Sequence, residues 1–233
     1  MIDARITIDL FKKLKFNIDL IDINNLQIND TNTIISNINK LLNCELEYRK
    51  SNAFNYRMKI SRFPVINLLN IDKSNINLTN IDILDTINNK KNMMFVGGPG
   101  SGKTYLSLYY GHKALELNFR VVYYKLNELS ETIVKGKQTN TYKKLCTRIA
   151  NYDMVIIDEL GYTPINKESS YILFELLSNI SENKTIVINT NLRFEEWGDT
   201  FGSDKSTKTL IDRITYNCHI IETGNKSFRH KQV

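Results

Sequence analysis

The feature that most constrains this chain is a glycine-rich loop that joins an apolar segment to a segment with helical periodicity. The loop reads GGPGSGKT at residues 97–104, and MMFVG at 93–97 leads into it. Glycines allow the backbone to curl so that successive N–H groups point at phosphate oxygens. A helix that starts at the loop adds its positive end. A strand before and a helix after argue against a chance glycine-rich turn, so the loop predicts a nucleoside triphosphate site.

Each position of this loop has an expected part in holding the triphosphate. The ammonium of Lys103 is expected to reach the β- and γ-phosphates, and the hydroxyl of Thr104 to ligate Mg²⁺. Contacts to the nucleotide are expected along the whole loop, at Gly97, Gly98, Pro99, Gly100, Ser101, Gly102, Lys103 and Thr104.

A pair of carboxylates ends a second apolar segment, MVIIDE at 154–159. The segment is expected to be a buried strand, and ligands of parallel α/β sheets bind at the carboxyl ends of the strands. Asp158 is expected to hold Mg²⁺, directly or through water, and Glu159 to polarise the attacking water. Such a pair of carboxylates is weak evidence alone, but in a chain with a phosphate loop it indicates hydrolysis of the nucleoside triphosphate. It argues against a small-molecule kinase, which needs no water-activating glutamate.

A third motif, TIVINTN, ends another apolar strand in asparagines. Asn191 is the first choice, and Asn189 the second, for a side chain that orients the attacking water or contacts the γ-phosphate. The alternative for either residue is an asparagine that satisfies a turn at the end of a strand, in a chain rich in asparagine.

A fourth motif, LIDRI, carries Arg213. A guanidinium presented to the γ-phosphate of a neighbouring subunit would stabilise charge in the transition state. The alternative is that Arg213 pairs locally with Asp212 or caps its own helix, and the residues alone leave both possibilities open.

Apolar strands and amphipathic helices alternate from residue 93 onward. This pattern predicts an α/β fold in which helices cover a parallel sheet. Strands are predicted at 93–97, 120–126, 153–159 and 184–190, and helices at 104–117 and 167–180.

The residues before the sheet divide into two parts. Residues 1–62 are predicted to form a small helical region for partner or DNA binding, which ends where RFP at 62–64 disfavours helix. Residues 63–92 are expected to be a connection into the core, and residues 93–233 the core itself.

Composition adds three limits. The net charge of +6 is compatible with a polyanionic partner without establishing one. Three scattered cysteines, with no C-x-x-C pair, are expected to be free thiols of a reducing cytoplasm. Neither a signal peptide nor a membrane-spanning segment is expected.

Two segments, residues 49–63 and 135–148, are basic and contain no acidic residue. In the first, aromatic residues alternate with the cations, which suits nucleic acid. For each segment, a solvated helix face is an equally good explanation. Neutralising Lys143 and Lys144 is expected to weaken DNA binding if the second segment contacts DNA.

Taken together, these motifs resemble the AAA+ ATPases, among them the IstB-like transposition helpers and more distantly the DnaC/DnaI helicase loaders. The resemblance is carried by GGPGSGKTYLSL, VIIDELGYTP, NLRFEEWGDTFG, TKTLIDRI and ETGNKSFR. It implies an AAA+ type P-loop NTPase with a three-layer parallel sheet. It also implies ATP and Mg²⁺ as cofactors, a sensor at Asn191 and an arginine finger at Arg213.

The chain departs from the family pattern at a few positions. Gly98 stands where proline is common, Ser101 where threonine is common, and the sensor reads Asn-Thr-Asn in place of Thr-Ser-Asn. A reduced lid is expected, since little sequence follows Arg229, a secondary candidate for a second sensor arginine.

The resulting hypothesis is an ATPase that oligomerises on DNA with ATP and recruits or regulates a transposase. One alternative is a DnaC-like helicase loader, whose partner is a replicative helicase. An alternative of another class is a nucleotide-gated scaffold that does not hydrolyse ATP.

Overall fold

A computed structural model describes residue 15 and residues 31–65, 81–162, 165, 167–201 and 204–225. The chain divides into two compact units, Met1–Tyr56 and Arg57–Val233. Besides residue 15, the described part of the first unit is residues 31–56, which form most of helix α2 (Thr31–Ile60). Most of the helical prediction for residues 1–30 lies outside the described residues. None of the helices that are described is long and apolar enough to cross a membrane.

Helix α2 ends at Ile60, two residues before the RFP sequence at 62–64 that predicts a break. Within the helix, Arg49 Nε lies 2.6 Å from Glu45 Oε1, four residues earlier. Acid before base at this spacing is the favourable order on a helix.

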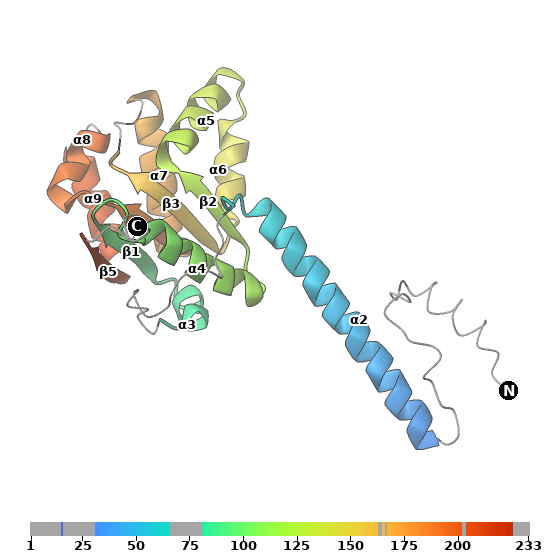
Figure 1. Cartoon of the computed structure of the whole chain (residues 1–233). Coiled ribbons are helices and arrows are strands. Elements are labelled where there is room, and N and C mark those ends of the chain that lie inside the picture. Colours follow the sequence, from blue (N-terminus) through green and yellow to red (C-terminus); the bar gives the residue numbers. More distant parts are fainter. Residues whose placement is uncertain are drawn as a thin grey trace, which may run out of the picture. The chain divides into compact units, whose positions relative to one another are not determined.

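The larger unit is built on a five-stranded parallel sheet of order β2-β3-β4-β1-β5 (Figure 1). The four predicted strands are confirmed, with bounds that differ by at most one residue. The fifth strand, β5, was not predicted, and it lies at the edge of the sheet beside β1. The strands are β1 (Asn92–Gly97), β2 (Val121–Lys125), β3 (Met154–Leu160), β4 (Thr185–Thr190) and β5 (Cys218–Gly224).

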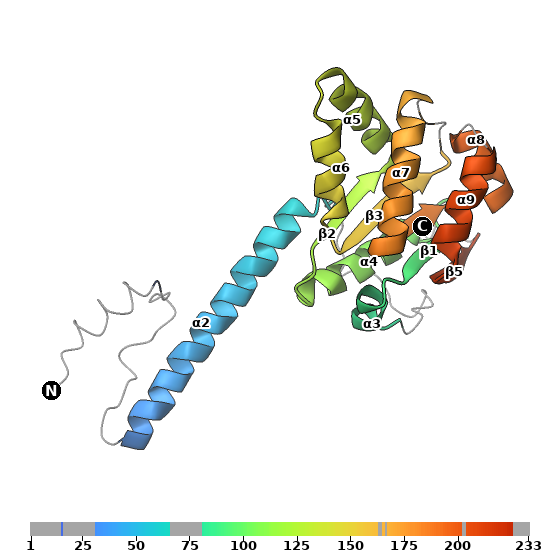
Figure 2. The same cartoon turned by 180° about the vertical axis from the view of Figure 1, so that it is seen from behind.

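Helices cover both faces of the sheet, which confirms the predicted three-layer arrangement. Helix α4 packs on one face, and α5, α6, α7 and α9 pack on the other (Figures 1 and 2). The bounds are α3 (Ile83–Asn88), α4 (Lys103–Glu116), α5 (Leu126–Gln138), α6 (Tyr142–Ala150), α7 (Lys167–Asn183), η4 (Phe194–Glu196), α8 (Trp197–Phe201) and α9 (Asp204–Thr215).

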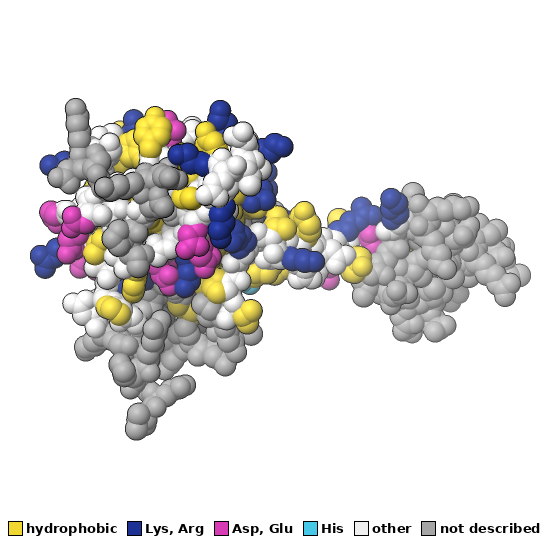
Figure 3. Space-filling view, turned by 90° about the horizontal axis from the view of Figure 1, so that it is seen from above, with side chains coloured by type: hydrophobic (Ala, Val, Ile, Leu, Met, Phe, Trp, Pro, Cys, Tyr) yellow, Lys and Arg dark blue, Asp and Glu magenta, His cyan; other side chains and the backbone are white. Residues whose placement is uncertain are grey.

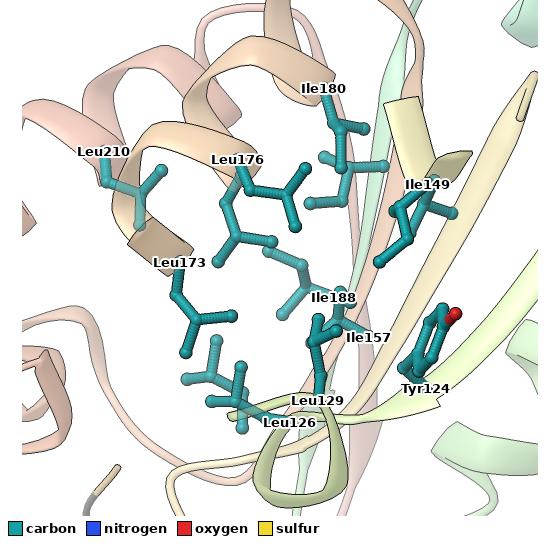
Figure 4. Packing of buried hydrophobic residues seen from close by; sticks show 14 of the residues in the cluster. Tyr124, Leu126, Leu129, Ile149, Ile157, Leu173, Leu176, Ile180, Ile188 and Leu210 are labelled. Carbon is teal, nitrogen blue, oxygen red and sulfur yellow. The ribbon is translucent and has the colours of Figure 1, made fainter. Parts of the chain in front are cut away.

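Alternate residues of each strand point to opposite faces, so the central strands are apolar throughout. In β3, Ile156 meets α4 near Gly111, whereas Ile157 belongs to the cluster beneath α5 and α7. Figure 4 shows this cluster, in which Leu173, Leu176 and Ile180 of α7 point at the strands. Asp158 and Glu159, which follow the apolar run that ends at Ile157, lie near the carboxyl end of β3.

Part of the connection expected at residues 63–92 is ordered as a helix. Asp82 caps α3, because its Oδ1 accepts a hydrogen bond of 3.1 Å from Asp85 N. Ile83 and Ile87 of this short helix are buried. Residues 66–80 lie outside the described part.

Candidate functional site

The phosphate loop joins the carboxyl end of β1 to the start of α4, as the sequence predicts. Gly100 and Gly102 have φ angles of 76° and 93°, in the left-handed region that favours glycine. Gly102 is also the N-cap of α4. The helix therefore begins at the loop and directs its free N–H groups toward it.

Lys103 folds back over this loop. Its Nζ donates to the carbonyl oxygens of Gly97 and Gly98 at 2.6 Å and 2.8 Å. The side chain is only 7% exposed. A buried ammonium is thus held inside the curve of the loop, where the phosphates of a nucleotide would need a positive charge.

Asp158 is the centre of the polar network at the carboxyl end of the sheet. Its Oδ2 accepts hydrogen bonds of 2.8 Å from both Thr104 Oγ1 and Tyr123 OH. Its Oδ1 accepts from Glu159 N at 2.8 Å and from Asn189 Nδ2 at 3.0 Å. The network joins α4, β2, β3 and β4, and fixes the orientation of a carboxylate that is 3% exposed.

Tyr123 also belongs to this network, although no sequence motif indicates it. Burial, followed by the negative charge of Asp158, raises the pKa of Tyr123 above its ordinary value. The phenol therefore stays protonated and remains a hydrogen-bond donor to Asp158 across the physiological pH range.

The oxygens of Thr104 and Asp158 fit the expected Mg²⁺. They lie 2.8 Å apart beside the phosphate loop, and hard oxygen ligands from one carboxylate and one hydroxyl suit this ion when phosphates complete its shell. Among the described residues, no group of three or more His, Cys, Asp or Glu side chains forms an all-protein metal site. The donor set suits a metal ion whose remaining ligands come from a nucleotide.

Glu159 lies at an irregularity of β3. Its φ angle is 60°, and the pairing of β3 with β4 shifts between Ile157 and Leu160. Such a bulge re-aims a side chain. Glu159 Oε1 lies 2.7 Å from Lys125 Nζ, and this hydrogen bond is the main cause that raises the pKa of Lys125. The carboxylate expected to activate water is thus held by a lysine that the sequence analysis did not single out.

The structure brings Asn189 into the network. Asn189 Nδ2 also donates to Ser107 Oγ at 2.8 Å, and the side chain is 1% exposed. Asn191, the first choice from the sequence, is exposed just after β4 ends at Thr190. Its role as a sensor stays a prediction. The available signal was position, because Asn189 lies inside the apolar strand, where a polar side chain needs a partner, whereas Asn191 follows the strand.

Arg213 lies near the end of α9 and points to a neighbouring helix. Its Nε lies 3.2 Å from Glu182 Oε1 of α7, and both side chains are about half-exposed. The local partner is therefore Glu182 and not Asp212, the partner considered from the sequence. Its role as a finger toward another subunit stays a prediction, and Arg229 lies outside the described residues.

The two basic segments have different environments. In the first, Arg57 Nη2 donates to Leu115 O and Asn118 Oδ1, and Phe63 packs at Gly111. These contacts tie the end of α2 to α4.

In the second segment, cations line two cavities along α6. The first is about 560 Å³, and the second about 440 Å³. Lys144 and Arg148 line both cavities, and Lys143 and Lys135 each line one. These four side chains form no ion pair with any residue that the structure describes. Figure 3 shows Lys and Arg side chains gathered along one side of the larger unit.

The sequence profile of the family described as "IstB-like ATP binding protein" matches residues 20–233. An ATP-binding protein of insertion sequence IS21 from Pseudomonas aeruginosa is 30% identical over 146 residues, which are 63% of this chain and 55% of that protein. Its counterpart from IS232 of Bacillus thuringiensis subsp. berliner is 25% identical over 219 residues, 90% of this chain and 87% of that protein.

Two solved structures share the fold. DnaI superposes with a TM-score of 0.55 at 17% identity, over 69% of this chain and 94% of its own. AMPPCP-bound DnaA from Aquifex aeolicus gives 0.51 at 17% identity, over 60% of this chain and 43% of its own. At such identity these similarities concern the fold alone, which is the P-loop AAA+ type that the sequence resemblance implies.

Proposed function

The chain belongs to the family of IstB-like ATP-binding proteins, and from this membership we propose that it is an ATPase that assembles on DNA and assists a transposase. The proposed cofactors are ATP and Mg²⁺, and the proposed location is the cytoplasm. The relatives' names tie them to insertion sequences, which supports transposition as the setting.

The observation that carries this proposal is the meeting of three side chains at one edge of the sheet. Lys103 lies inside the phosphate loop, and Thr104 follows it and contacts Asp158 at 2.8 Å. We propose that Lys103 exchanges the carbonyl oxygens of Gly97 and Gly98 for phosphate oxygens when ATP binds. Thr104 and Asp158 would hold Mg²⁺, which when bound neutralises charge on the phosphates.

Hydrolysis is assigned to Glu159. Glu159 follows Asp158, which contacts Thr104 at the start of α4, and its carboxylate could accept a proton from an attacking water. Lys125 competes for the same carboxylate at 2.7 Å, so Glu159 must leave this lysine in order to act. The presence of Lys103, Asp158 and Glu159 in one chain argues against the alternative of a scaffold that binds ATP without turnover.

Asn189 and Asn191 provide a matched pair for locating the sensor. We propose Asn189 because it contacts Asp158, and it replaces Asn191 as the first choice. Asn189→Ala is expected to lower ATP turnover by about tenfold or more, while Asn191→Ala stays within about threefold. The reverse order in a steady-state ATPase assay would return the assignment to Asn191.

The proposed oligomer places ATP between subunits, with Arg213 facing the γ-phosphate of a neighbour. The pair between Arg213 and Glu182 does not prevent this, because half-exposed ion pairs contribute only about 0–1 kcal/mol. Arg213→Ala is expected to leave ATP binding by the isolated subunit unchanged and to lower turnover of the assembly by about 10³-fold. Unchanged turnover in the assembled state would remove the finger role.

DNA is assigned to the α5–α6 surface. Lys143, Lys144 and Arg148 form no ion pair within the part of the chain that the structure describes, and cations of this kind bind phosphates. The chain's net charge of +6 favours the same partner.

The helicase loader remains the second candidate, because the loaders share the fold. The deciding experiment is capture of partners by the full chain with ATP and duplex DNA present. Recovery of a transposase supports the helper, and recovery of a replicative helicase supports the loader. A chain that binds neither ATP nor DNA would refute both.

A further inference from the structure

We infer that Thr223, in strand β5, is a positioning residue for the phosphate loop and thereby sets the affinity for nucleotide. The inference rests on the proposed binding of ATP to this loop, and it assigns a role to the ETGN end of β5, which the proposed function leaves unused.

Thr223 is the extra residue of a β-bulge. In the pairing of β1 with β5, Val96 lies opposite Glu222, but Gly97 lies opposite Gly224. The residue between them in β5 therefore has no counterpart in β1, and a bulge of this kind turns its side chain away from the regular position. The bulge lies where β1 gives way to the phosphate loop.

The Thr223 hydroxyl joins the strand to the loop. Its Oγ1 donates to Val96 O at 3.2 Å and lies 2.6 Å from Ser101 Oγ. A hydroxyl has one proton to donate, so the second bond runs from Ser101 to Thr223. Ser101 is only 2% exposed and no other hydrogen bond is found for its hydroxyl in the described part of the chain, so Thr223 is the acceptor that satisfies it.

Two further contacts hold the loop from the same side. Gly98 N donates to Gly224 O at 3.0 Å. A Cβ added to Gly97 would lie 2.3 Å from Thr223 Oγ1, so the backbone approaches the hydroxyl as closely as glycine allows. Strand β5 therefore fixes the first half of the phosphate loop. Lys103 contacts the carbonyl oxygens of Gly97 and Gly98 in the same half.

This geometry predicts an effect on binding and not on chemistry. Phosphate binding requires the loop N–H groups to point at one place, and a loop already held in shape binds with less loss of conformational entropy. The Thr223 hydroxyl contacts Ser101 and Val96 of the protein. It would therefore stabilise the bound substrate and the transition state equally. Loss of such uniform binding raises KM and leaves kcat unchanged.

The test compares Thr223→Val, which keeps the shape without the hydroxyl, with Thr223→Ser, which keeps the hydroxyl. The matched control is Thr86→Val in α3, since Thr86 is buried and its hydroxyl donates to Asp82 O at 2.6 Å, away from the loop. Affinity is measured by titrating the full chain with a fluorescent ATP analogue, alongside KM, kcat and Tm.

Thr223→Val is expected to raise Kd and KM about tenfold with kcat within about twofold, while Thr223→Ser stays within about threefold of the wild type. Thr86→Val is expected to lower Tm without changing Kd. If Thr223→Val does not fold, Ser101→Ala removes the other partner of the same bond and is expected to give a similar rise in Kd.

Wild-type affinity for Thr223→Val or, where that variant does not fold, for Ser101→Ala, overturns the inference and leaves the proposed function standing. An equal loss in Thr223→Val and Thr223→Ser also overturns it, because the methyl group and not the hydroxyl would then matter. A wild-type chain that binds no nucleotide refutes the proposed function itself, and the inference with it.

Discussion

The two basic segments, residues 49–63 and 135–148, have similar composition but different environments. In the first, cations hold the chain together, because Arg57 bonds to Leu115 and Asn118, and Arg62 lies 4.3 Å above the ring of Tyr124. In the second, Lys143 and Lys144 line cavities and have no acidic partner among the described residues. A run of basic residues therefore indicates a polyanionic partner only where the side chains of those residues are not already bonded within the fold.

The largest effect on this comparison is expected from Arg57→Ala. The change removes two hydrogen bonds from the guanidinium, one to Leu115 O and one to Asn118 Oδ1, at 3.2 Å and 2.8 Å. The free energy of unfolding is expected to fall by about 2 kcal/mol. Urea denaturation measures this, and the salt dependence of DNA binding should stay as in the wild type. A flatter salt dependence with unchanged stability would reverse the assignment of the first segment.

The matched change in the second segment is the double variant Lys143→Ala with Lys144→Ala. DNA affinity is expected to fall about tenfold in low salt, and the slope of log K against log salt to flatten by about 2, since two phosphate contacts are lost. Fluorescence anisotropy at several salt concentrations measures both values. Stability and ATP binding should not change, because both side chains are exposed. An unchanged salt slope would remove this surface from the proposal.

The smallest effect is expected from removing the cation of Arg62, which belongs to the first segment. Arg62→Gln removes a cation from the face of Tyr124 and should lower the free energy of unfolding by about 0.5–1 kcal/mol. The measurement is again urea denaturation, with Lys59→Gln as the control because Lys59 is exposed and has no partner among the described residues. Equal effects of the two variants would show that the ring contact contributes nothing.

The phosphate loop between β1 and α4, the strands β1 to β4, and the place of Asp158 and Glu159 near the end of β3 were predictable because a short local pattern indicates each of them. Strand β5 was missed because CHIIETG is largely exposed and has neither a long apolar run nor a strict alternation of polar and apolar residues. Tyr123 and Lys125 were missed because their roles depend on the pairing of β2 with β3, in which Lys125 lies opposite Asp158. The sequence around a residue does not show which residue of a neighbouring strand lies opposite it.

The same limit explains the basic segments. Arg57 meets Leu115 and Asn118 far along the chain, and only the fold brings them together. For the sensor, by contrast, the signal was already present in the sequence. Asn189 lies inside the apolar strand β4 and is buried, and a buried polar residue in a central strand needs a partner, whereas Asn191 lies beyond the end of the strand.

The account is tested most directly by measuring ATP binding and ATP turnover for the full chain and for Glu159→Gln, with Mg²⁺ and duplex DNA present. The account predicts that the variant binds ATP within about twofold of the wild type and loses turnover by about 100-fold or more. Turnover that is equally slow in both proteins would contradict it and favour a scaffold that binds ATP without hydrolysing it.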